Sequence, residues 1–202
     1  MLKNPQFHYM KLYIIIPIIV IGLSSYFVLA LGVFPEKYLE QKQLEPSPYF
    51  EAILSDTQIQ LGESFLIQID SENVGDYGDI YIISAAFPEL DNLDGIVKIT
   101  NYDLSHTPLM INVGDEIGAS YTGGVETVLA KYPSIEAMNR PVPSNSKFNM
   151  DLLITPQKTG SFVIYVKNIA IPHVSEQSHF PRDGILDHQN EYVKKYTVEV
   201  IS

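Results

Sequence analysis

The fold is decided by KFNMDLLITPQKTGSFVIYVKNIAI, residues 147–171, in which two alternating runs flank the turn signal TPQKTG. Every second side chain of each run is apolar: one face carries Phe148, Met150, Leu152 and Ile154 in the first run, and Phe162, Ile164 and Val166 in the second. Successive side chains of a strand point to opposite faces. The stretch therefore predicts two β-strands, each with one buried face.

The same alternation returns on both sides of this stretch, in FLIQID at residues 65–70 and in YVKKYTVEVI at residues 192–201. Turn signals rich in Gly, Asn, Asp and Pro separate the runs, as at residues 61–64, 73–79 and 92–95. Several short alternating strands at this spacing favour an antiparallel β-sandwich. We therefore expect a mainly β fold.

Two motifs carry a resemblance to a known family. L-G-E-S-F-x-I-x-I at residues 61–69, followed by Asn73-Val-Gly75, and L-x-I-T-P-x-x-T-G-x-F-x-I-x-V at residues 152–166 resemble the immunoglobulin-like domains of membrane-anchored prokaryotic and archaeal cell-surface proteins. The resemblance spans roughly residues 50–110 and 147–202, and it implies an immunoglobulin-like sandwich. Residues 113–146 depart from it as an insertion that is too long for a plain strand connection.

A membrane anchor is expected at the N-terminus. Residues 12–34 contain no charged side chain, and as a helix they would be about 34 Å long, enough to cross a hydrocarbon core of about 30 Å. The apolar stretch is longer than that of a cleavable signal peptide, and no typical cleavage site follows it. We therefore expect an uncleaved signal anchor, followed by a polar stem at residues 35–48 and a sandwich domain at residues 49–202.

Charge predicts the orientation of this anchor. Lys3 and Lys11 precede the span and no acidic residue does, so the positive-inside rule places residues 1–11 in the cytoplasm and the C-terminal domain outside the cell membrane. The chain carries a net charge of −11, and residues 36–202, with 11 basic and 24 acidic side chains, carry −13. Such a surface repels nucleic acid and attracts cations or a basic partner.

DIYIISAAFPEL, residues 79–90, is apolar on both faces. One face should meet the sandwich core, so the other face must also be covered. We expect the insertion at residues 113–146 to cover it with a short helix, because apolar residues follow a helical spacing at Val125, Val128, Leu129 and Tyr132. A partner protein is the alternative, which makes Tyr81, Ile83 and Phe87 candidate partner-binding residues.

HVSEQSHFPRDGILDH, residues 173–188, holds the candidate metal ligands His173, His179 and His188. Imidazole and carboxylate groups suit Zn²⁺ or Cu²⁺, but the histidines lack the tight spacing of paired ligands. We expect an irregular, exposed loop without a metal, in which Phe180 is a further partner-binding candidate. Acidic turns at residues 70–79 and 89–95 suit Ca²⁺ in ligand type but do not fit EF-hand spacing.

Nothing in the sequence predicts catalysis. There is no G-x-S-x-G, H-E-x-x-H or P-loop motif, and the absence of cysteine excludes disulfides and thiolate chemistry. We expect a non-catalytic binding or structural module of the cell surface, without a cofactor and with a protein partner. Two alternatives remain open: an accessory single-pass subunit of a larger membrane complex, and an extracytoplasmic metal-binding protein that uses residues 173–188.

Overall fold

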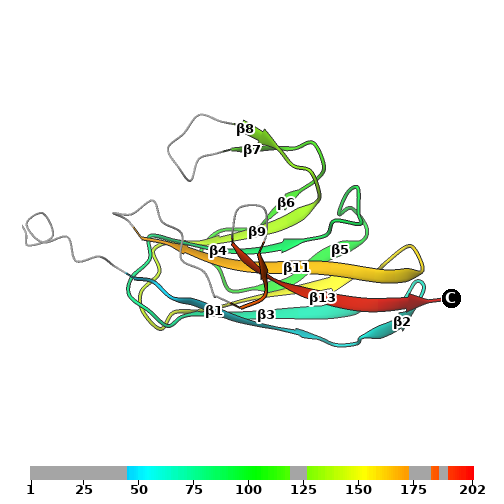
Figure 1. Cartoon of the computed structure of the whole chain (residues 1–202), viewed down its shortest axis with the longest axis horizontal. Helices are drawn as coiled ribbons and strands as arrows, with labels where there is room; N and C mark the ends of the chain where they lie inside the picture. The colour runs from blue at the N-terminus through cyan, green and yellow to red at the C-terminus, as the bar shows by residue number, and fades with distance from the viewer. Residues whose placement is uncertain (1–44, 119–126, 173–182, 187–190) are drawn as a thin grey trace, which may run out of the picture. The chain divides into compact units, whose positions relative to one another are not determined.

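The computed structural model describes residues 45–118, 127–172, 183–186 and 191–202, which all belong to one compact unit. These residues form strands, turns and loops, and none of them is helical (Figure 1). The fold of the described part is therefore mainly β, as the alternating runs predict. No helix that could cross a membrane occurs within the described ranges, and the expected span at residues 12–34 lies outside them.

The described residues form thirteen strands, of between two and twelve residues. In chain order they are β1 (Pro48–Leu54), β2 (Gln58–Gln60), β3 (Phe65–Asn73), β4 (Ile80–Ala86), β5 (Val97–Tyr102), β6 (Leu109–Ile111), β7 (Glu116–Gly118), β8 (Thr127–Leu129), β9 (Ser134–Asn139), β10 (Lys147–Ile154), β11 (Gly160–Ile171), β12 (Ile185–Leu186) and β13 (Tyr192–Ile201).

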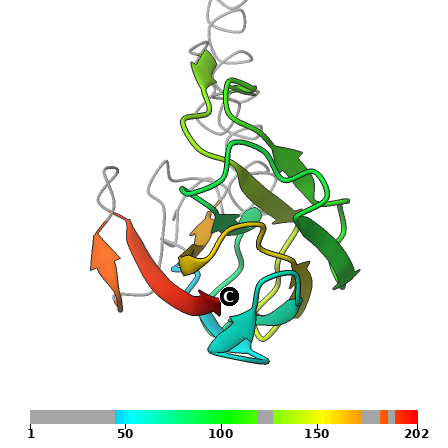
Figure 2. The ribbon, with the colours of Figure 1, turned by 90° about the vertical axis from the view of Figure 1, so that its right-hand side faces the viewer.

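Two sheets make up most of the domain. The four-stranded sheet has the order β1-β3-β10-β5, and the larger sheet has the order β12-β13-β11-β4-β9-β6. Every neighbouring pair along these two orders is antiparallel, while β2 joins β13 as a parallel partner. The turn after β10 carries the chain from the first sheet to the second, so the two runs of residues 147–171 lie in different layers (Figure 2).

The core lies between the two sheets. The residues that the alternation places on the buried faces are at most 6% exposed, and they are Phe65, Ile67, Ile69, Phe162, Ile164 and Val166. Phe162 lies at the centre, with its ring centroid 6.0 Å from that of Phe65 and 6.4 Å from that of Phe87. This packing of apolar faces from opposite sheets makes the described domain a β-sandwich.

β4 is buried on both faces, as its sequence predicts, but the expected assignment of those faces is wrong. Tyr81, Ile83 and Phe87 belong to the central core and are all 0% exposed. They cannot form a partner-binding surface, because the four-stranded sheet already covers them. The opposite face carries Ile82, which is 7% exposed and lies in register between Ile169 of β11 and Met138 of β9.

The described parts of the insertion, residues 113–118 and 127–146, form strands, turns and loops where a helix was expected. Thr127–Leu129 form β8, which pairs with β7, and Ser134–Asn139 form β9, a full member of the larger sheet. Leu129 is exposed rather than packed against β4. The helical spacing was misleading because β-branched Thr127 and Val128 suit a strand, and pairing between strands overrides a short periodic signal.

Phe162→Ala tests the position of the core. We expect the free energy of unfolding to fall by about 3–5 kcal/mol, because apolar burial is lost and a cavity remains. Ile53→Ala is the control, since Ile53 is 58% exposed, and it should cost less than about 1 kcal/mol. Urea unfolding followed by circular dichroism measures both values, and equal losses would contradict the central position of Phe162.

Candidate functional site: an acidic groove on the four-stranded sheet

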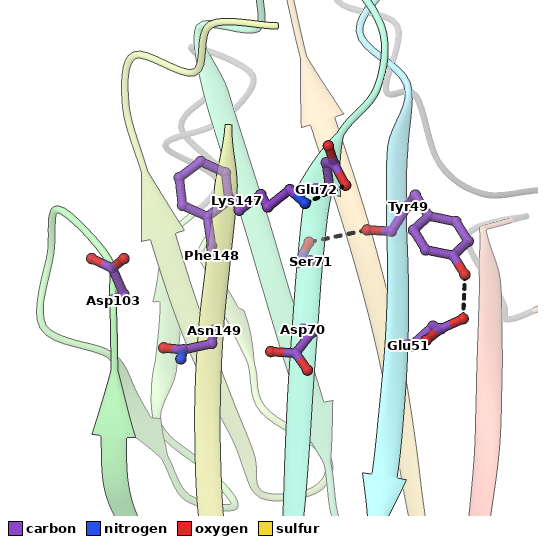
Figure 3. A pocket seen from close by; sticks show the side chains of 9 residues that line it. All are labelled: Tyr49, Glu51, Asp70, Ser71, Glu72, Asp103, Lys147, Phe148 and Asn149. Carbon is purple, nitrogen blue, oxygen red and sulfur yellow. Dashed lines mark hydrogen bonds and ion pairs between the residues drawn. The ribbon is translucent and has the colours of Figure 1, made fainter. Parts of the chain in front are cut away.

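The outward face of the four-stranded sheet is hollowed into a shallow groove of about 380 Å³ (Figure 3). Its lining residues come from β1, β3 and β10 and from the residue that follows β5, and they are Tyr49, Glu51, Asp70, Ser71, Glu72, Asp103, Lys147, Phe148 and Asn149. Most of them are polar and four are carboxylates. Asp70 and Glu72 alternate along β3 with the buried Ile69, Ser71 and Asn73, so the groove opens on the face that points away from the core.

The antiparallel register brings these side chains together from distant parts of the chain. Glu51 of β1 is opposite Asp70 of β3, which is opposite Asn149 of β10. Two residues further along the strands, Tyr49 and Lys147 flank Glu72 in the same way. Residues that are opposite each other in adjacent strands share a face, so two rows of outward polar side chains cross the sheet.

The groove is strongly negative. Of its nine lining residues, Glu51, Asp70, Glu72 and Asp103 are acidic and Lys147 is the single base. Lys147 Nζ lies 3.6 Å from Glu72 Oε2, but the lysine side chain is 75% exposed. An ion pair this open to water is weak, so it leaves most of the negative potential in place.

Tyr49 lies at the β1 margin of the groove. Its hydroxyl donates a 2.5 Å hydrogen bond to Glu51 Oε1. This hydrogen bond to the Glu51 carboxylate raises the pKa of the Tyr49 hydroxyl above its usual value, because ionisation would place two negative charges side by side. The tyrosine therefore stays a neutral donor that orients the carboxylate.

Two acceptor oxygens of β10 are left without donors. Asn149 Oδ1, in the groove, and Asp151 Oδ1, one pair further along the same face, have almost no solvent contact and no hydrogen-bond partner among the described residues. Asp151 uses its other oxygen, Oδ2, to accept a 3.4 Å hydrogen bond from Asn101 Nδ2. An enclosed acceptor without a donor is costly, so these two oxygens do not contribute to the stability of the sheet.

A buried polar network supports the groove from behind. Asn168 Nδ2 lies 2.6 Å from Ser71 Oγ and 2.8 Å from the hydroxyl of Tyr81, which itself donates a 2.8 Å hydrogen bond to the carbonyl of Glu72. The network links β11 and β4 of the larger sheet to β3 of the smaller one. It therefore fixes the backbone of β3 at the position from which Glu72 projects.

The residues predicted from the sequence fall into three groups. His173, His179, His188 and Phe180 lie outside the described residues, so the exposed loop without a metal stays a prediction and the metal-binding alternative stays open. Tyr81, Ile83 and Phe87 are in the core and not in the groove. Of the acidic residues in the two turns, only Asp70 and Glu72 line the groove. The described ranges hold no group of three or more His, Asp or Glu side chains arranged for a metal ion.

Glu51, Asp103, Lys147 and Asn149 line the groove but are not predicted from the sequence. The sequence gives only a weak indication of their role. Each is a polar residue on the outward face of an alternating run, or beside such a run, and solvated side chains ordinarily occupy such positions. Only the strand order shows that they are neighbours.

Comparison with known proteins gives no family. No family model matches the sequence, and no curated protein matches it. Among solved structures, the chain is similar to a β-glucosidase from Listeria innocua, with 10% identity and a TM-score of 0.38 over 78% of this chain and 16% of that one. The chain thus spans less than a fifth of that enzyme's length.

Two smaller domains are similar over more of their own length. A CARDB domain from Pyrococcus furiosus, solved with di-metal ions, has 9% identity and a TM-score of 0.34 over 79% of this chain and 90% of that one. A collagen-binding domain from a Staphylococcus aureus adhesin has 13% identity and a TM-score of 0.34 over 75% and 96%. Similarities this weak carry no argument about what the chain binds.

Tyr81→Phe tests the buried network through pH. Burial is the main cause that raises the pKa of Tyr81 from 10.0 to about 12 in the folded protein. Between these pH values the unfolded chain loses the proton first, so ionisation favours unfolding and stability falls as pH rises.

Urea unfolding below pH 10 and near pH 12 measures this loss of stability. The loss should be smaller in Tyr81→Phe than in the parent protein, although the variant is less stable throughout because Asn168 loses a partner. Equal losses in both proteins would show that Tyr81 ionises like an exposed tyrosine.

Proposed function

We propose that this protein is a membrane-anchored, extracytoplasmic and non-catalytic binding module, with an immunoglobulin-like sandwich whose acidic groove binds a basic segment of a partner protein. The observation that carries the proposal is the groove itself, with three carboxylates and one lysine on adjacent strands and a fourth carboxylate just after β5. The charge of the domain agrees with it, since residues 45–202 contain 22 acidic and nine basic side chains.

The chemistry of the groove favours binding over catalysis. Its lining offers carboxylates, one amide and hydroxyl groups, and neither His nor Cys is among the nine lining residues. The carboxylates project from paired strands, whose backbone positions are set by the ladder. Fixed acceptors on a rigid sheet complement fixed donors, and arginine and lysine side chains supply donors together with the opposite charge.

The anchor and orientation rest on the sequence. Residues 12–34 form a charge-free apolar stretch that is long enough to span a bilayer, and the lysines before it place the sandwich outside the cell. Residues 35–44 separate the span from the sandwich. At about 3.3–3.6 Å per residue they reach at most about 36 Å, so the groove would work close to the membrane surface.

An accessory subunit of a membrane complex is the second candidate, and one feature favours it. β7 and β8 form a ribbon that belongs to neither large sheet (Figure 1). Large apolar side chains are exposed on this ribbon and around its base, at Leu109, Met110, Val113, Leu129 and Tyr132. A ribbon of two short strands is marginal by itself, so a neighbouring subunit would stabilise it.

Protease protection tests the topology. External protease on intact cells should remove residues 45–202 and leave a short N-terminal fragment in the membrane, because the positive-inside rule places only residues 1–11 in the cytoplasm. Immunoblotting with tags at each end measures the fragments. A chain that stays whole until the membrane is permeabilised would contradict the outward orientation.

Glu51→Gln combined with Asp70→Asn tests the groove. Affinity for an oligo-arginine peptide should fall roughly fivefold or more, because two exposed charge pairs are lost, and the difference should shrink as salt screens the charges. The matched control is Asp91→Asn with Asp94→Asn, which removes the same charge from a loop outside the groove. Calorimetry measures both variants, and equal losses would show that net charge alone binds the peptide.

A further inference from the structure

β1 is the first strand after residues 1–44, so any pull on the N-terminal segment enters the sandwich at Glu45. Among the described strands it is also an edge strand of the four-stranded sheet, with β3 as its single ladder partner. An edge strand that is held on one side only is the easiest strand of a sheet to detach. The contacts of β1 are therefore the ones that decide how the domain responds to such a pull.

The residues just before β1 are fastened to those just after β3. The amide of Val74 donates to the carbonyl of Ser47 at 2.9 Å, and the amide of Asp76 donates to the carbonyl of Glu45 at 3.0 Å. Gly75 allows this close approach, since a Cβ atom there would lie 2.4 Å from both the Glu45 carbonyl oxygen and the Ser47 nitrogen. Residues 45–47 and 74–76 thus extend the β1–β3 pairing beyond the ladder.

Asn73 joins this extension to a third segment. Its side chain is fully buried; Oδ1 accepts a 3.0 Å hydrogen bond from the amide of Ser47, and Nδ2 lies 3.3 Å from the carbonyl of Pro143. Its backbone carbonyl accepts a 2.7 Å hydrogen bond from the amide of Asn145, and its amide donates at 3.0 Å to Ser146. The side chain and the backbone amide and carbonyl of Asn73 therefore hold three segments together at the N-terminal end of β1.

The second edge of β1 is held by side chains of the larger sheet. Asn168 Nδ2 lies 3.2 Å from the carbonyl of Tyr49, and Lys194 Nζ lies 3.4 Å from the carbonyl of Phe50 and 4.9 Å from the centroid of its ring. β1 is thus bonded on both sides, through a ladder on one and through side chains on the other.

We propose that β1 with the Asn73 cluster (Asn73, Gly75 and residues 45–47) is an attachment built to carry tension from the N-terminal segment into the sheet. β1 pairs with β3 antiparallel over seven residues, from Pro48 opposite Asn73 to Leu54 opposite Ile67. A pull along β1 toward its N-terminus loads these bonds together, in shear. The Asn73 cluster prevents the alternative, in which the strand peels away one bond at a time from its first residue.

The inference rests on the proposed membrane anchoring for its purpose but not for its geometry. An anchored module whose groove holds a partner is pulled between its N-terminus and the outer face of the four-stranded sheet. Both points lie on one sheet, since β1 and β3 also supply much of the groove lining. Tension would therefore pass along the β1–β3 ladder without separating the two sheets.

Pulling on the full chain in detergent tests the proposal. Because the chain has no cysteine, Gln43→Cys and Lys98→Cys provide two unique handles, one before β1 and one on the exposed side of β5. Under constant force, Asn73→Ala should shorten the lifetime of the folded domain about tenfold, because several buried hydrogen bonds are lost where the load enters. Lys194→Met is a second and milder variant that acts on the other edge of β1, and it should also shorten the lifetime.

Asn139→Ala is the matched control. Asn139 is a buried asparagine that accepts a 2.9 Å hydrogen bond from the amide of Ser105, and it lies on β9, away from β1. It should lower stability without force but leave the lifetime under force nearly unchanged. The proposal is overturned if Asn139→Ala shortens the lifetime as much as Asn73→Ala, or if neither β1 variant changes it. Both outcomes are independent of protease protection, which tests the anchor alone.

Discussion

The structure depends on one layer of apolar side chains that is buried between two sheets. Phe65, Phe87 and Phe162 meet at its centre, and no disulfide can assist them because the chain contains no cysteine. For a sandwich of this size, burial of apolar surface is the dominant favourable term. In β1 and β3, where only one face is committed to this layer, the other face is free to carry charge.

The acidic groove forms because these outward faces carry charge and the pairing of the strands brings the charged side chains together. Glu51, Asp70 and Asn149 are far apart in the chain, yet the β1-β3-β10 order places them in one row. Like charges in one row repel, and the single lysine beside them offsets little of this repulsion. The sheet tolerates the repulsion because the inward faces of the same strands are fully packed, which favours a role for the groove in binding over a role in stability.

β1 is part of the groove and is also the strand that follows the N-terminal segment. It supplies Tyr49 and Glu51 to the groove, and it receives the chain from the N-terminal segment. The cluster around Asn73 and the side chains of Asn168 and Lys194 hold it on both edges. A partner in the groove and an anchor on the stem would therefore act on the same sheet. The force between them would not pull the two sheets apart.

The sequence by itself determined the class of fold and the inward faces of the main strands, because a period of two in apolar side chains is a local property of the chain. The turn signals, the negative charge and the absence of catalytic motifs and cysteine are local properties too. The apolar span at residues 12–34 is a prediction of the same kind.

Only the tertiary structure decided which strands are neighbours, and the groove depends on that order. Sequence alone did not predict the groove because Glu51, Asp103 and Lys147 each resemble an ordinary solvated residue until the register brings them together. The same limit explains both errors. Tyr81, Ile83 and Phe87 sit on one of two apolar faces of β4, and packing chose which face turned inward. Thr127–Leu129 became a strand because β7 was there to pair with it, and pairing between distant segments is a property that no local pattern records.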